Sequence, residues 1–217
     1  MQGFEKSHPT VQVHVSYGSS GNFYSQSVNQ APFDLFLSAD VEYARKLAEQ
    51  GLTLPGTDFV YAGGQLALWV PKTSPIDVGK LQIAALEDPT VQHIAIANPQ
   101  HAPYGQAAEA AMQSLGVYAA VKSKIVLGEN IAQTLQFVQS GNAEIGIVAL
   151  ALVLAPSVRD QGRFWELPPA SYPPIEQGGV ILKAAKNPAG ARALRDFIMS
   201  PDGQSILQQY GYSKPGA

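Results

Sequence analysis

The sequence predicts an α/β fold of two lobes, each with a mostly parallel sheet flanked by helices and with a cleft between the lobes. Apolar runs of strand length alternate with segments whose apolar residues recur at helical spacing, an order typical of parallel sheets. Two stretches near residues 64–71 and 173–179 are broken by glycine or proline, and we expect them to carry the chain between the lobes. The 217 residues suffice for two such lobes.

A strand and the loop after it organise the N-terminal part of the sequence. Residues 11–17 (Val-Gln-Val-His-Val-Ser-Tyr) alternate between apolar and polar, which predicts a strand. A Gly/Ser loop over residues 18–22 follows, and then a helix over residues 23–29. The N–H groups and the dipole at such a helix start favour an anion. These residues alone leave open the alternative that Ser19 or Ser20 only caps the helix.

The later helices and strands are predicted from the spacing of apolar residues, together with capping residues and prolines. Ser38 or Asp40 can cap a helix over residues 41–51, and Pro103 suits the first turn of a helix. Strands are expected at residues 33–37, 59–70, 93–97, 124–127, 143–150 and 180–182. Further helices are expected at residues 103–115, 130–140, 188–199 and 201–210, with a short apolar helix that ends before Pro156. The proline-rich residues 165–174 are interpreted as an irregular return linker.

The composition limits the classes of function. A formal net charge of −3 gives no basic field for nucleic acid or for an anionic membrane. There are no cysteines, so disulfides, thiolate metal sites and a cysteine nucleophile are excluded. No apolar run is long enough to cross a membrane. The first residues lack the pattern of a signal peptide, which predicts a cytoplasmic protein or a processed form.

The sequence contains only weak matches to known catalytic motifs. Residues 18–22 (Gly-Ser-Ser-Gly-Asn) are one residue short of the Gly-x-Ser-x-Gly elbow of a serine hydrolase. Three of the four histidines are interpreted as structural or surface residues, and only His101 lies near a candidate site. No spacing typical of metal ligands and no nucleotide-binding glycine loop occurs. The sequence therefore favours a binding protein without a cofactor or a free metal ion, and a hydrolase that uses Ser20 is the disfavoured alternative.

A second strand, loop and helix start lies at residues 93–106. The N–H groups of Tyr104, Gly105 and Gln106 are candidate donors to an anion. Two such helix starts facing one cleft would bind a tetrahedral oxyanion through neutral N–H and O–H donors. Because a fully deprotonated oxyanion offers only acceptors, a site made only of donors selects it against its protonated forms.

Several motifs together resemble the periplasmic molybdate/tungstate-binding proteins of ABC importers, and the similarity runs through nearly the whole chain. The matching segments are residues 17–22, 31–40, 66–69, 94–99, 102–105, 129–130 and 146–150. The C-terminal residues 200–204 and Tyr210-Gly211-Tyr212 are common to many importer-binding proteins and are less specific.

The resemblance implies a type II periplasmic binding protein fold, with lobe 1 at residues 1–70 and 178–217 and lobe 2 at residues 71–177. It implies a non-enzymatic protein of the periplasm that binds molybdate or tungstate in the cleft and delivers it to an ABC permease. The implied oxyanion contacts are Ser20, with Ser19 beside it, the N–H of Tyr104 and the N–H of Val148. Another tetrahedral oxyanion such as sulfate is the alternative ligand.

The resemblance also implies an N-terminal strand and a polar loop that precede residues 4–6 in the family. A sheet without that strand would have unpaired edges between residues 11–17 and the strand at Leu35. We therefore expect weakened or altered anion binding and a homo-oligomer formed by strand exchange. At the extreme, the chain would be a truncated form that no longer binds. Gln177 stands where some family members carry a ligand-binding tyrosine, and the nearby Tyr172 fits that motif less well.

Overall fold

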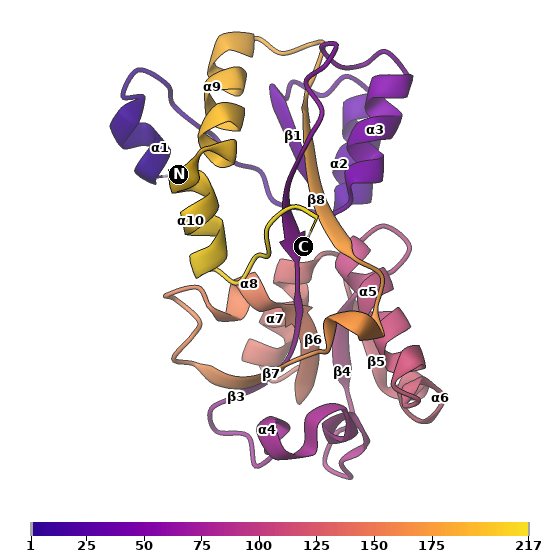
Figure 1. The fold of residues 1–217 in the computed structure, drawn as a ribbon. Helices are drawn as coiled ribbons and strands as arrows, with labels where there is room; N and C mark the ends of the chain where they lie inside the picture. Colours follow the sequence, from indigo (N-terminus) through magenta and orange to yellow (C-terminus); the bar gives the residue numbers. More distant parts are fainter. Residues whose placement is uncertain (1, 217) are drawn as a thin grey trace. The chain divides into compact units, whose positions relative to one another are not determined.

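The computed structural model describes residues 2–216, which form two compact units. Unit 1 consists of residues 2–63, 176–209 and 213–216, and unit 2 of residues 64–175 and 210–212. Each unit contains one β-sheet with helices around it (Figure 1). None of the helices in residues 2–216 is long and apolar enough to span a bilayer.

Unit 1 is built on a three-stranded sheet with the order β1-β8-β2. These strands are Leu35–Ser38, Ile175–Ile181 and Phe59–Gly64. The helices of this unit are α1 Gln2–Ser7, α2 Ser20–Val28, α3 Val41–Glu49, α9 Pro188–Met199 and α10 Pro201–Gln209. One apolar core of the unit joins the sheet to α2 and α3, and it contains Phe36, Ala44, Leu47, Val180 and Leu182 with Phe23, Phe33 and Tyr43 packed against it.

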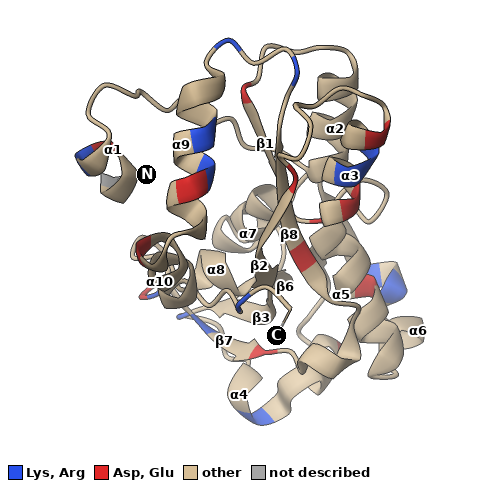
Figure 2. Ribbon diagram, turned by 45° about the horizontal axis from the view of Figure 1, so that its top comes forward, with Lys and Arg blue, Asp and Glu red and all other residues tan. Residues whose placement is uncertain are grey.

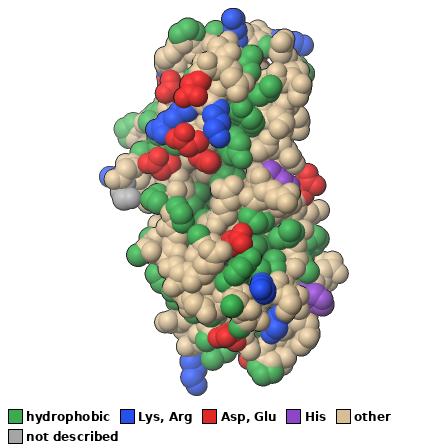
Figure 3. Space-filling view, turned by 90° about the vertical axis from the view of Figure 1, so that its right-hand side faces the viewer, with side chains coloured by type: hydrophobic (Ala, Val, Ile, Leu, Met, Phe, Trp, Pro, Cys, Tyr) green, Lys and Arg blue, Asp and Glu red, His purple; other side chains and the backbone are tan. Residues whose placement is uncertain are grey.

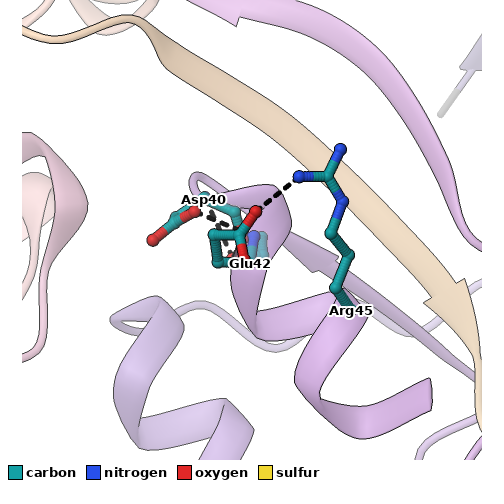
Figure 4. A network of polar contacts seen from close by, with 4 residues as sticks. Asp40, Glu42 and Arg45 are labelled. Atoms are coloured by element: carbon teal, nitrogen blue, oxygen red, sulfur yellow. Dashed lines mark hydrogen bonds and ion pairs between the residues drawn. The ribbon is translucent and has the colours of Figure 1, made fainter. Parts of the chain in front are cut away.

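Helix α3 shows how local sequence sets the element boundaries. Asp40 is its N-cap, and the Asp40 carboxylate accepts a hydrogen bond from the Glu42 N–H at 2.9 Å (Figure 4). Val41, Ala44 and Leu47 are buried at helical spacing. On the outer face Glu42 pairs with Arg45, as Figure 4 also shows. The predicted helix over residues 41–51 is therefore confirmed.

Charges of both signs are interspersed on the surface of unit 1. Helix α3 carries the Glu42–Arg45 pair, and α9 carries an ion pair between Arg195 and Asp196 at 2.6 Å. Figure 2 shows basic and acidic positions beside one another on both helices. The face drawn in Figure 3 likewise shows basic and acidic side chains next to one another. Exposed ion pairs of this kind contribute little to stability.

Residues 11–17 form no strand, so the prediction from their alternating pattern was wrong. Among the described residues, 12–18 find no partner for a backbone hydrogen bond. Val15 is 47% exposed and Tyr17 is 84% exposed. The physical reason is that a period of two yields a strand only where a neighbouring strand pairs with it. The nearest candidate, β1, pairs on one edge only, with β8.

Unit 2 is built on a five-stranded sheet with the order β5-β4-β6-β3-β7. These strands are Ile125–Gly128, Ile94–Ala97, Ile145–Ala149, Leu66–Pro71 and Gly162–Glu166. The α-helices are α4 Val78–Leu81, α5 Pro103–Ser114, α6 Tyr118–Val121, α7 Ile131–Gln139 and α8 Leu150–Val153. Three 3-10 helices are η1 Gln82–Glu87, η2 Lys122–Lys124 and η3 Pro169–Ser171. A core around Trp69, Ala95, Leu135, Val138 and Val148 fills the space between this sheet and its helices.

The strand directions correct the sequence-based prediction in one respect. Strand β4 pairs in parallel with β5 and β6, but β3 pairs antiparallel with β6 and β7, and β1 pairs antiparallel with β8. The α/β class is confirmed, whereas the expected predominance of parallel pairing is wrong. Parallel pairing is confined to the strands joined by crossover helices, and apolar patterning does not encode strand direction.

Two boundaries also differ from prediction. Residues 162–166 form β7, so the predicted irregular linker at residues 165–174 begins as a strand. Strand β8 begins at Ile175, before the predicted strand at residues 180–182. In both places the hydrogen-bonding partner lies far away in sequence, on β3 or on β1, and local pattern cannot identify it.

Candidate functional site

The start of α2 holds two buried serines in unit 1. Ser19 is the N-cap of α2, and its hydroxyl accepts a hydrogen bond from the Asn22 N–H at 3.3 Å. The Ser20 hydroxyl accepts from the Ala39 N–H at 3.0 Å, which ties the loop to the turn after β1. Ser19 is 3% exposed and Ser20 is 7% exposed. Capping is therefore the role of Ser19, whereas Ser20 connects two segments of unit 1.

Ser20 is still able to donate a hydrogen bond. A serine hydroxyl has one hydrogen and two lone pairs, and the Ala39 N–H uses only a lone pair. Within residues 2–216 no acceptor binds the Ser20 hydroxyl hydrogen. The N–H groups of Ser20 and Gly21 lie in the first turn of α2, where a helix offers no internal acceptor and its dipole is positive. This helix start can therefore bind an anion with neutral donors.

In unit 2, the start of α5 lies directly against the end of β4. A Cβ atom on Gly105 would lie 2.0 Å from the Ala97 carbonyl oxygen, so only glycine permits this approach. The N–H groups of Gly105 and Gln106 both donate to the Ala102 carbonyl, at 2.9 and 3.2 Å. The expectation that these two N–H groups bind an anion was therefore wrong. Tyr104, which is 6% exposed, is the candidate retained from this helix.

The turn from β6 into α8 carries the other predicted contact of unit 2. The Leu150 N–H donates to the Gln65 carbonyl at 2.8 Å, and Val148 stands opposite Ala67 in the same antiparallel ladder. Hydrogen-bonded pairs alternate along such a ladder, so the Val148 N–H is directed at Ala67 and the Ala149 N–H away from β3. This register disagrees with the expectation that the Val148 N–H contacts an anion, and it favours Ala149 as the donor of this turn.

Other residues singled out from the sequence have structural partners. The Tyr172 hydroxyl accepts a hydrogen bond from the Leu66 N–H at 3.2 Å, and burial raises the pKa of Tyr172. Gln177 is 3% exposed and its side-chain oxygen lies 3.5 Å from the Tyr61 hydroxyl. His101 Nε2 lies 3.1 Å from the Glu129 carbonyl oxygen. No cluster of side chains suited to a metal ion occurs within residues 2–216.

One contact at this site was missed by sequence reasoning. The side chain of Tyr212 hydrogen-bonds to that of Tyr104, and burial raises the pKa of Tyr212. The Tyr-Gly-Tyr motif at residues 210–212 was visible in the sequence, but nothing in its spacing connects it with α5. Only the tertiary structure, in which residues 210–212 are part of unit 2, brings the two tyrosines together.

Comparison with known proteins assigns the chain to a family. The family model described as bacterial extracellular solute-binding protein matches residues 1–213. The chain belongs to this family. Membership makes the chain a relative of substrate-binding components of transporters.

Two relatives are 40% or more identical to this chain over the aligned residues. A protein of Rhodobacter capsulatus named molybdate-binding protein ModA is 40% identical over 200 residues, which are 92% of this chain and 77% of the relative. A protein of the same name from Azotobacter vinelandii is 43% identical over 201 residues, or 93% of this chain and 79% of the relative. The resemblance inferred from the sequence motifs is thereby confirmed.

A solved structure agrees with this relationship. The structure titled Azotobacter vinelandii periplasmic molybdate-binding protein superposes with a TM-score of 0.89 at 36% sequence identity, covering 99% of this chain and 92% of that chain. The type II periplasmic binding protein fold expected for this family member is therefore confirmed.

Proposed function

We propose that this family member binds molybdate or tungstate as the intact oxyanion and delivers it to an ABC permease in the periplasm, without catalysing a reaction. The observation that carries the proposal is the 40% and 43% identity, over 92% and 93% of the chain, to proteins named molybdate-binding protein ModA. The two units correspond in this proposal to the two lobes expected from the sequence.

The proposed donors come from one helix start in each unit and from one turn. Ser20, with Ser19 as the cap that holds the loop, supplies the contacts of unit 1. Tyr104 at α5 and the β6–α8 turn, with Val148 paired to β3 and Ala149 as donor, supply those of unit 2. All these donors are neutral, and molybdate as a dianion offers only acceptors. A donor-only site therefore selects the dianion over protonated species.

The first prediction concerns ligand binding by the purified chain. Titration calorimetry with molybdate is expected to show saturable binding, tungstate is expected to compete, and sulfate is expected to give little heat. The reason is that sulfate is smaller than molybdate and cannot span the same set of fixed donors equally well. Equal or tighter binding of sulfate would support the alternative oxyanion, and absence of heat with every anion would support a truncated, non-binding form. If the wild-type chain hydrolysed a test ester and Ser20→Ala did not, the result would support the alternative function of a serine hydrolase.

We further propose that two copies of the chain associate by strand exchange in unit 1. A groove of about 510 Å³ lies between residues 11–17, β1 and α9. The Leu182 N–H donates to the Asp34 carbonyl, and ladder alternation then turns the backbone groups of Leu35 and Leu37 away from β8. Each copy thus offers an unpaired strand edge and an unpaired, strand-patterned segment, so reciprocal exchange of residues 11–17 satisfies both.

The second prediction tests this association by light scattering after size-exclusion chromatography. The wild-type chain is expected to form a dimer that dissociates on dilution. Val13→Pro is expected to be monomeric, because proline removes a backbone donor and is disfavoured inside a sheet. Val13→Thr, which keeps a β-branched residue, is the matched control and is expected to remain dimeric. A wild-type chain that is monomeric at every concentration would contradict the proposal.

A further inference from the structure

The C-terminal residues 210–212 form a small segment of unit 2 between two stretches of unit 1. Helix α10 ends at Gln209, and Ser213 forms an antiparallel bridge with Gly63, both in unit 1. The three residues between them, Tyr-Gly-Tyr, belong to unit 2. The chain thus leaves unit 1 for only three residues, and the contacts of those residues show where they attach.

Gly211 attaches the segment to α8. It has φ +77°, a left-handed conformation that favours glycine. A Cβ atom at this position would lie 2.8 Å from side-chain carbons of both Leu150 and Leu154. The backbone of the segment is therefore in close contact with the helix that begins immediately after Ala149.

Tyr212 attaches the same segment to α5. Its side chain hydrogen-bonds to the side chain of Tyr104 in the first turn of α5. Burial raises the pKa of Tyr212, so its hydroxyl keeps its hydrogen at physiological pH. Tyr104 itself is 6% exposed, so this hydrogen bond is shielded from water.

We propose that Tyr212 is a positioning residue that fixes the start of α5, and with Gly211 the start of α8, in the geometry needed for oxyanion binding. This inference rests on the proposed function, because α5 and the β6–α8 turn are the proposed donors of unit 2. The segment acts by holding two separate elements of unit 2 in a fixed relation to each other.

The test compares Tyr212→Phe with Tyr210→Phe in the full chain. Tyr212→Phe keeps the ring and removes only the hydroxyl that bonds to Tyr104. Tyr210→Phe is the matched control, because it makes the same change in the same segment and no hydrogen bond of the Tyr210 hydroxyl occurs within residues 2–216. Tyr212→Phe is expected to weaken molybdate binding about three- to tenfold, the loss typical of one buried hydrogen bond. Tyr210→Phe is expected to bind as the wild type does.

A second measurement needs no ligand. Hydrogen–deuterium exchange of the unliganded protein is expected to be faster at the start of α5 in Tyr212→Phe and unchanged in Tyr210→Phe. Loss of the buried hydrogen bond is expected to lower the thermal midpoint of Tyr212→Phe by about 2–4 °C, while Tyr210→Phe keeps the wild-type midpoint. Tyr104→Phe removes the other partner of the same bond, so the double variant is expected to lose no more than either single variant.

The outcomes separate this inference from the proposed function. Wild-type exchange at α5 together with wild-type affinity in Tyr212→Phe would overturn the inference. A lower thermal midpoint with unchanged affinity and unchanged local exchange would also overturn it, since that is a merely structural role. A wild-type protein that binds no oxyanion would overturn the proposed function, and the exchange experiment would then decide the positioning role alone.

Discussion

Gly105→Ala is expected to destabilise the protein by about 3 kcal/mol or more, at the upper end of the cost of overpacking. The added Cβ would lie 2.0 Å from the Ala97 carbonyl oxygen and 2.7 Å from its carbon. Both atoms are backbone at the end of β4, so no side-chain rotation relieves the contact. Helix α5 would have to move away from the sheet, and Tyr104 would move with it. Urea unfolding measures the loss of stability, and calorimetry measures the accompanying loss of molybdate binding.

The matched control for this variant is Gly79→Ala in α4. A Cβ atom on Gly79 would meet only the Asp77 carboxylate oxygen, at the ordinary distance of 3.5 Å. Alanine is preferred to glycine within a helix, so this variant is expected to be as stable as the wild type or slightly more stable. Equal unfolding midpoints for Gly105→Ala and Gly79→Ala would show that α5 does not need the close approach to β4.

Ser20→Ala is expected to have the largest effect on affinity among the single hydroxyl deletions. It removes the hydroxyl hydrogen proposed to bind the oxyanion, and a hydrogen bond to a charged group contributes about 1.5–3 kcal/mol. Binding of molybdate should therefore weaken roughly 10- to 100-fold. The Ala39 N–H also loses its acceptor, which should lower the free energy of unfolding by about 1 kcal/mol.

Ser25→Ala is the control for Ser20→Ala, because Ser25 lies on the exposed part of the same helix. It is expected to keep wild-type affinity and stability. Calorimetry of both variants, with thermal unfolding in parallel, separates loss of binding from loss of folding. Wild-type affinity in Ser20→Ala would remove the Ser20 hydroxyl from the proposed oxyanion contacts.

Elements with strong local signals could be predicted from the sequence. Helix α3 was predicted because Asp40 is a good cap and Val41, Ala44 and Leu47 recur at helical spacing, and the structure confirms it. Strand β4, with four buried apolar residues, was likewise predicted within one residue. Seven short motifs, among them residues 17–22, 94–99 and 146–150, together indicated the family. Each of these signals is contained in a few consecutive residues.

The donors of the candidate site could be predicted only in part. The pattern drew attention to two helix starts, but it could not tell which N–H groups already have acceptors. Gly105 and Gln106 donate to Ala102, and the register of β6 directs the Val148 N–H to Ala67. A hydrogen-bond partner depends on strand register and helix onset, which the residue types do not specify.

The sequence by itself determined the α/β class, most helix and strand positions and the family of the chain, because periodicity, capping residues and motifs are local properties. Only the tertiary structure decided the strand directions, the absence of a strand at residues 11–17 and the contact of Tyr212 with Tyr104. These features depend on partners far apart in sequence. Backbone pairing and burial exist only once those partners have been brought together by folding.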